Sequence, residues 1–240
     1  MASKGIALIL GAGSNVGQAL SSAFSKAGYK VALVSRSIKE SSSDKQIQIP
    51  ADLSNPDAVP SIFESVRQKL GADPNVVVYN AATLTPPSDS SNPFTIDISA
   101  FEKDMSLANT SAYVAAREAV AGFERLDKNL PKSFIYTGNW LNAVTMSNPI
   151  FVTLAAGKSA AAAWIGGASV HYKNKGYGFY FADERTAEGR PITDGVSGAA
   201  HAEAYLELAG GKVEQPWHTT FVAGKGFVDF PETRKAYVDS

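Results

Sequence analysis

The chain has 240 residues, 45% of them hydrophobic, and its 22 basic residues nearly balance its 23 acidic ones. This composition excludes a disordered chain, and the balanced charge makes nucleic acid and anionic membrane surfaces poor partners. There is no cysteine, which excludes disulfides and thiolate sites, and the three histidines lack metal-ligand spacing, so we expect no metal. No segment approaches a signal peptide or a transmembrane helix, and we therefore expect a soluble, cytoplasmic protein.

Short apolar runs alternate with longer stretches of helical spacing, which is the pattern of βαβ units around a parallel sheet. The runs lack polar alternation, as expected for strands covered on both faces, so we predict one α/β domain with a doubly wound parallel sheet of about seven strands. The predicted strands cover residues 6–10, 30–35, 46–49, 75–79, 133–137, 178–181 and 219–222. The predicted helices cover residues 16–27, 57–70, 99–124, 154–173 and 198–208.

The first predicted strand runs directly into a glycine-rich loop that is followed by an amphipathic helix. Glycine permits a tight turn there and lets backbone amides approach a pyrophosphate at the positive end of the helix. A turn without a ligand is the alternative interpretation, but the place of the loop in the first βαβ unit strengthens the motif. The loop therefore predicts a dinucleotide site formed by Gly11, Gly13, Ser14, Asn15, Val16 and Gly17.

The end of the second predicted strand indicates which dinucleotide is bound. This strand ends in Ser35, and Arg36 follows it. Folds that bind NAD usually place a carboxylate here for the ribose 2′-hydroxyl, whereas a guanidinium suits a 2′-phosphate and also stacks on adenine. We therefore expect NADP(H), with Ser14, Ser35 and Ser37 as further donors. A solvated loop arginine is the alternative.

The glycine loop and several later segments resemble the short-chain dehydrogenase/reductase family over nearly the whole chain. Gly11 and Gly17 match the first and last glycines of its TGxxxGxG loop, while Leu10 replaces its threonine and Asn15 its middle glycine. The resemblance implies a Rossmann fold that binds a nicotinamide cofactor. It assigns further cofactor contacts to Asp52 and Leu53 after the third strand and to the NNAG-like segment Asn80, Ala81 and Ala82.

The resemblance also implies catalytic positions, of which two are kept and two are changed. The family's asparagine and lysine correspond to Asn109 and Lys158, with the lysine binding the nicotinamide ribose. The family's tyrosine lies four residues before its lysine, where this chain has Leu154. Its serine ends the fifth strand, where this chain offers Thr137 or Asn139.

The changed positions leave the proton donor open, because leucine cannot perform acid–base catalysis. Asn139, at the carboxyl end of a strand, can donate a hydrogen bond to a carbonyl oxygen but cannot ionise. After the sixth strand the family's Pro-Gly pair is replaced, and the strand continues into Asp183-Glu184-Arg185. Asp183 is either an acid or part of an ion-pair cluster. Tyr136 is either a replacement proton donor or a residue that strand alternation buries in the sheet. The candidate catalytic residues are Asn109, Asn139, Lys158 and Asp183.

The sequence therefore predicts an atypical NADP(H)-dependent oxidoreductase that reduces a small carbonyl or imine compound. The proton that the substrate oxygen takes up would come from water, from the substrate itself or from an acid near Asp183. An iminium substrate would need no proton when the hydride arrives. One alternative is a related protein that catalyses a non-redox step, and another is a non-catalytic nucleotide sensor or regulatory protein. We expect the loop 83–93 and the part of the chain at about 183–218 to border the substrate, the latter as a lid. The family resemblance implies a homodimer or homotetramer that pairs the long helices.

Overall fold

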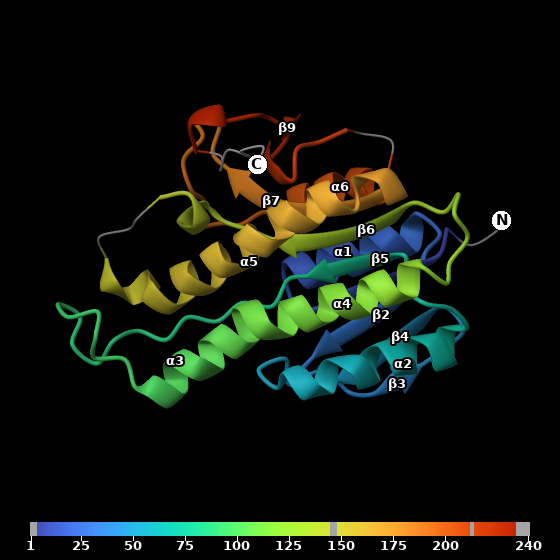
Figure 1. The fold of residues 1–240 in the computed structure, drawn as a ribbon, viewed down its shortest axis with the longest axis horizontal. Coiled ribbons are helices and arrows are strands. Elements are labelled where there is room, and N and C mark those ends of the chain that lie inside the picture. Colours follow the sequence, from blue (N-terminus) through green and yellow to red (C-terminus); the bar gives the residue numbers. More distant parts are fainter. Residues whose placement is uncertain (1–3, 145–147, 212–213, 234–240) are drawn as a thin grey trace.

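Nine strands form one sheet within the described part of the chain, residues 4–144, 148–211 and 214–233 of a computed structural model (Figure 1). The strands are β1 (Ile6–Leu10), β2 (Lys30–Ser35), β3 (Ser41–Ser42), β4 (Gln46–Pro50), β5 (Val76–Tyr79), β6 (Lys132–Thr137), β7 (Tyr177–Arg185), β8 (His218–Val222) and β9 (Gly226–Phe227). The helices are α1 (Val16–Lys26), α2 (Val59–Leu70), α3 (Ile98–Met105), α4 (Ser111–Phe123), α5 (Val152–His171) and α6 (Gly198–Ala209).

The sheet has the strand order β3-β4-β2-β1-β5-β6-β7-β8-β9. The seven strands from β4 to β8 are parallel, which confirms the predicted doubly wound α/β fold. The prediction of about seven strands missed β3 and β9, which pair antiparallel at the two edges. Each has only two residues, and a run that short carries no hydrophobic pattern that would reveal it.

Helices cover both faces of the sheet, and each face has its own core. Side chains of α2, α4 and α5 pack on one face, and those of α1 and α6 pack on the other (Figure 1). Strand β1 shows the consequence: Leu8 faces the first core and Ile9 the second, and both are fully buried. This double covering explains why the parallel strands have no polar face.

The predicted helix 99–124 is wrong in its middle, because a π-helical turn, Ser106–Thr110, separates α3 from α4. Two buried tyrosines contact this turn from the sheet. The Tyr79 hydroxyl donates to the Leu107 carbonyl at 2.5 Å, and the Tyr136 hydroxyl donates to the Ala108 carbonyl at 2.7 Å. These bonds satisfy carbonyls in the irregular turn, and no local sequence pattern predicts them.

Two further expectations need correction. Within the predicted lid, residues 186–197 form a loop, whereas α6 packs into the core beside α1 and belongs to the sheet's covering layer. The segment Pro149–His171, which contains α5, has a hydropathy of 1.3 and is long and apolar enough to span a membrane by composition alone. The expectation that no segment approaches such a span was therefore too strong. A core helix passes the same test, and α5 carries the buried Lys158 against the sheet.

Candidate active site

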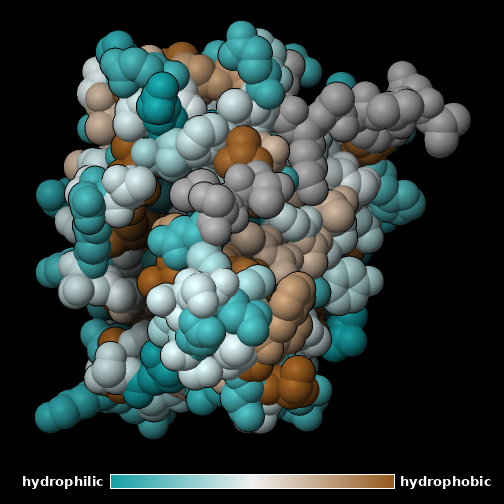
Figure 2. Space-filling view, turned by 90° about the vertical axis from the view of Figure 1, so that its left-hand side faces the viewer, coloured by the Kyte–Doolittle hydropathy of each residue, from teal (hydrophilic) through white to brown (hydrophobic). Residues whose placement is uncertain are grey.

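The predicted site residues gather at one edge of the sheet, because the carboxyl ends of parallel strands all lie at the same edge. The glycine loop follows β1, Arg36 follows β2, Asn80 follows β5 and Asn139 follows β6. Figure 2 views the molecule from this side, where apolar residues appear between polar ones on a hollowed surface. The strand topology therefore assembles residues that lie far apart in the sequence.

The two glycines of the loop, Gly11 and Gly13, have different surroundings. Gly11 has a φ of 95°, and a Cβ there would lie 2.4 Å from the Ala81 nitrogen, so only glycine fits between the two segments. Asn80 holds the turn by donating from Nδ2 to the Gly11 carbonyl at 2.9 Å. Gly13, by contrast, is exposed and a Cβ there would meet nothing within 4 Å.

The amino end of α1 lies at this loop and is not capped by its own N-cap side chain. Asn15 occupies the N-cap position but makes no capping hydrogen bond. Its Nδ2 instead donates to the Val196 carbonyl at 2.8 Å. The positive end of the helix dipole is therefore left without a side-chain acceptor from Asn15, and it suits an anion.

The end of β2 presents an exposed arginine and an unsatisfied hydroxyl. Arg36 is exposed, and the Ser35 Oγ is buried with no hydrogen-bond partner in the part of the chain that the structure describes. Asp52 lies close enough that the Arg36 charge helps to lower its pKa, although hydrogen bonds from Ser54 have the largest effect. The Leu53 side chain belongs to the core. These features fit the adenosine end of a dinucleotide, and the carboxylate that would mark NAD is not at the end of β2.

Lys158 is the buried cation of the site. It is 4% exposed, its Nζ donates to the Thr137 carbonyl at the end of β6, and the same atom lies 4.6 Å from the centre of the Tyr136 ring. Burial lowers the lysine pKa to about 8, and the negative charge of Asp183 opposes this shift. Leu154 lies one helical turn earlier on the same face of α5.

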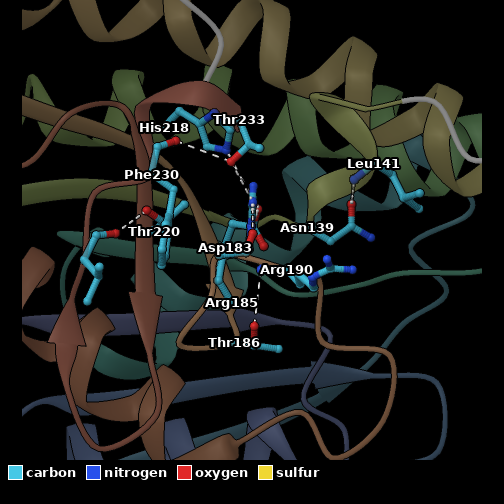
Figure 3. Close-up of polar contacts among 12 residues, drawn as sticks. Asn139, Leu141, Asp183, Arg185, Thr186, Arg190, His218, Thr220, Phe230 and Thr233 are labelled. Carbon is cyan, nitrogen blue, oxygen red and sulfur yellow. Dashed lines mark hydrogen bonds and ion pairs between the residues drawn. The ribbon is translucent and has the colours of Figure 1, made fainter.

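The two candidate asparagines have different surroundings. Asn139 Oδ1 accepts from the Leu141 nitrogen at 3.2 Å and caps the short helix Trp140–Asn142 (Figure 3). Asn109 Oδ1 accepts from Trp164 Nε1 at 3.0 Å. The amide oxygen of Asn109 therefore points toward the middle of α5. The described structure gives no hydrogen bond between Asn109 and Lys158, whose Nζ donates to the Thr137 carbonyl.

Asp183 belongs to a buried ion pair, the alternative that the sequence left open (Figure 3). Arg185 Nε donates to Asp183 Oδ2 at 2.6 Å, and both side chains are at most 1% exposed. Arg185 Nη1 also donates to the Gly189 carbonyl and to Thr233 Oγ1, at 3.1 and 2.9 Å. The guanidinium lies 5.7 Å from the Trp140 ring centre.

The sequence left open an ion-pair cluster of Asp183, Glu184 and Arg185, and in the structure the pair forms between Asp183 and Arg185. The alternation of Asp183, Glu184 and Arg185 along a strand was a signal that the first and third share one face.

Glu184 points to the other face and anchors the loop 186–197. Its Oε2 accepts from the Ser197 nitrogen at 2.9 Å and lies 3.5 Å from His201 Nδ1. Burial raises the pKa of Glu184 and lowers that of His201. Together with the bond from Asn15 to Val196, this contact holds the end of the loop 186–197 beside the glycine loop.

The other predicted border of the site, the loop 83–93, is held to α3 and α5. Thr83 Oγ1 donates to Asp104 Oδ1 at 3.1 Å, and the Thr85 nitrogen donates to Thr153 Oγ1 at 3.4 Å. Among the residues that the structure describes, no group of three His, Asp or Glu side chains is arranged to hold a metal ion.

Comparison with known proteins identifies the family of the chain. The family model described as short chain dehydrogenase matches residues 5–129. A curated relative, the short chain dehydrogenase/reductase dmxR12 of Cryptosporiopsis sp. (strain 8999), is 40% identical over 242 residues, covering 95% of this chain and 96% of the relative.

Solved structures share the fold at low sequence identity. A short-chain dehydrogenase/reductase from Serratia marcescens is 16% identical with a TM-score of 0.73, covering 92% of this chain and 97% of that one. The NADPH-dependent 3-quinuclidinone reductase of Rhodotorula rubra is 19% identical with a TM-score of 0.73, and the match covers 92% of this chain and 90% of that one. The matched family model and the 40% identical relative show that the chain belongs to the short-chain dehydrogenase/reductase family of oxidoreductases.

Proposed function

We propose that the protein is an NADP(H)-dependent reductase of a small carbonyl or imine compound. The observation that carries this proposal is the pair of cations at one edge of the sheet, Arg36 after β2 and Lys158 beside the end of β6. These strands are separated by β1 and β5, so the glycine loop lies between the two cations. A dinucleotide laid across this edge meets Arg36 at its 2′-phosphate, the loop at its pyrophosphate and Lys158 at its nicotinamide ribose.

The substrate side of the site is formed by the turn that follows β6. Asn139 lies at its start, and Trp140 Nε1 and both amide atoms of Asn142 are buried without a hydrogen-bond partner in the described part of the chain. Buried polar atoms of this kind suit a polar ligand. We propose that these groups orient the substrate, while a bound reduced nicotinamide supplies the hydride.

The outer faces of α4 and α5 carry exposed apolar side chains, and we propose that these faces pair in a homodimer. Tyr113 on α4 is 56% exposed and Val170 on α5 is 43% exposed. Between these helices lies a cavity of about 350 Å³, lined in part by Tyr113, Trp164 and His171. Burying these apolar groups against a second copy would stabilise a dimer or tetramer. Light scattering at micromolar concentration is the check, and an isolated monomer would contradict this arrangement.

A binding titration tests the cofactor assignment before any substrate is known. Purified protein is titrated with NADPH and, separately, with NADH, and tryptophan quenching and energy transfer to the nicotinamide report binding. We expect NADPH to bind more tightly than NADH. Failure to bind either nucleotide would overturn the proposed function.

Turnover assays then separate the three activities considered. Steady oxidation of NADPH by ketones or iminium compounds supports the reductase. Turnover of a compound without net oxidation of the cofactor indicates a non-redox enzyme, and binding without chemistry indicates a sensor.

A further inference from the structure

The acidic and hydroxyl groups around the ends of β6 and β7 already have partners within the described residues. The Tyr136 hydroxyl donates to Ala108, and the Tyr205 hydroxyl donates to Thr137 Oγ1 at 2.9 Å; both side chains are fully buried. Asp183 is bonded to Arg185, and Glu184 accepts from Ser197 on the opposite face. None of these four groups is free to protonate a substrate beside α5.

Lys158 differs from these groups in its position and its hydrogen bonding. A protonated lysine has three N–H donors, and the described structure gives Lys158 one acceptor, the Thr137 carbonyl. Side chains four residues apart lie on one face of a helix, so the half-buried Leu154 lies on the same face of α5 as Lys158. Leucine has no hydroxyl, so position 154 supplies no proton donor on this face of α5.

We propose that Lys158 itself is the general acid that protonates the substrate oxygen in carbonyl reduction. This inference rests on the proposed reductase function and adds the group that transfers the proton. The lysine is both the ribose-binding cation and the proton donor, so the site needs no tyrosine at position 154.

The proposed step balances in atoms and charge. The carbonyl carbon accepts a hydride from the reduced nicotinamide, which is oxidised, and the C=O π electrons move to oxygen. A Lys158 Nζ–H bond breaks and the proton forms the new O–H bond, which leaves the neutral amine. The amine takes up a proton from water before the next turnover. A lysine pKa of about 8 suits this exchange at neutral pH, because donors with a pKa near the working pH are the most effective.

The titration of Lys158 can be measured without substrate or cofactor. Protein labelled with ¹³C and ¹⁵N in lysine is followed by NMR from pH 6 to 11, and the Lys158 signal is assigned by its loss in Lys158→Met. We expect a midpoint near 8 for Lys158. A midpoint above 10 would overturn the proposal, whatever the result of nucleotide binding.

Substitution by arginine separates proton donation from charge. Arginine stays protonated in proteins, so Lys158→Arg keeps a cation for the ribose but cannot exchange a proton near neutral pH. We expect NADPH affinity within about fivefold of the wild type and at least a hundredfold loss of kcat on ketones, the lower limit for losing a general acid. The pH profile of the wild type should fall above the NMR midpoint, and that fall should be absent in Lys158→Arg.

Strand β6, whose end Lys158 contacts, also offers a matched control lysine. Lys132 is also buried, at 5% exposure, and its Nζ donates to the carbonyls of Asp127 and Leu130 at the amino end of β6. Lys132→Arg should leave the kcat on ketones and its pH profile unchanged. Thermal melting checks that both variants fold.

A rescue experiment completes the test. In Leu154→Tyr/Lys158→Arg a tyrosine hydroxyl is available to donate the proton, and we expect kcat to recover at least tenfold over Lys158→Arg. Lys158→Arg retaining ketone turnover within a few-fold, or wild-type reduction confined to iminium compounds, would overturn the proposal. Loss of NADPH binding in the wild type would overturn the proposed function instead.

Discussion

Asn15 Nδ2 donates a hydrogen bond of 2.8 Å to the Val196 carbonyl, joining residues 181 positions apart. Asn15 belongs to the glycine loop, and Val196 lies at the end of the loop 186–197. The bond therefore couples the proposed phosphate-binding segment to the segment that we propose borders the substrate. Where the family motif has its middle glycine, this chain has a side chain that makes this connection.

Asn15→Ala should loosen the loop 186–197. The lost hydrogen bond contributes roughly 0.5 to 1.5 kcal/mol, so amide exchange at Val196 and Ser197 should accelerate by about 2- to 10-fold. Hydrogen–deuterium exchange with mass spectrometry measures this change. Asn55→Ala, which removes a cap at the start of the helical turn Pro56–Ala58, is the control and should leave the loop unaffected. Equal exchange in both variants would contradict the coupling.

Gly11 and Gly13 should respond differently to alanine. Gly11→Ala forces a Cβ against the Ala81 backbone at a φ of 95°, so it should lower the free energy of unfolding by about 2 kcal/mol or more. Gly13→Ala meets no protein atom, so it should change stability by less than about 0.5 kcal/mol. Its Cβ would instead occupy space that the pyrophosphate needs, and NADPH affinity should fall at least tenfold. Urea unfolding measures the two stabilities, and titration with NADPH measures the affinity. Wild-type NADPH affinity in Gly13→Ala would contradict this prediction.

Arg36→Asp should remove the preference for NADPH. A charged hydrogen bond contributes about 1.5 to 3 kcal/mol, and the aspartate adds repulsion of the 2′-phosphate, so the NADPH-to-NADH affinity ratio should fall by about a hundredfold. The fluorescence titrations measure this ratio directly. Lys39→Asp makes the same change in charge at an exposed position nearby and should alter the ratio much less. An unchanged ratio in Arg36→Asp would remove this arginine from the site.

Burial of Lys158 should make stability depend on pH in a defined window. Its pKa is lowered from 10.5 to about 8, so between these values the unfolded state holds a proton that the folded state has released. Unfolding therefore becomes less favourable as pH rises through this window, by about 3 kcal/mol in all. Below pH 8 the full penalty of burying the cation is present.

The comparison with Lys158→Met isolates this effect. The stability of the wild type relative to the variant should rise from pH 7.5 to 10.5, as measured by urea unfolding without cofactor. Lys128→Met, at an exposed position, should show no such trend. A difference that stays constant with pH would refute the assigned shift.

Breaking the Asp183–Arg185 pair should be costly because it leaves one buried charge without its partner. Either Asp183→Leu or Arg185→Leu should lower the free energy of unfolding by about 3 to 5 kcal/mol. The double variant should be more stable than either single one, because it buries neither charge. Lys175→Ala breaks an exposed pair with Glu124 and should cost far less, because water screens that pair. Additive losses in the double variant would contradict the pairing.

The amino-acid sequence by itself determined the fold class and the position of the glycine loop after β1. The runs 6–10 and 30–35 are apolar and end in turn residues, and both were predicted with the bounds that the structure shows for β1 and β2. The glycine loop and the arginine after β2 are local signals as well. These features depend on residues that are close together in the sequence, so the sequence pattern is enough to predict them.

Tertiary structure decided what depends on contacts between distant residues. The predicted strand 178–181 extends to Arg185 because Asp183 and Arg185 neutralise each other inside the protein, where unpaired charges would not be buried. The π-helical turn depends on hydroxyls of Tyr79 and Tyr136, which reach it from the sheet. Lys158 has its lowered pKa because folding places it beside the end of β6 and away from water. These properties arise from burial and pairing across the fold, and local propensity does not encode them.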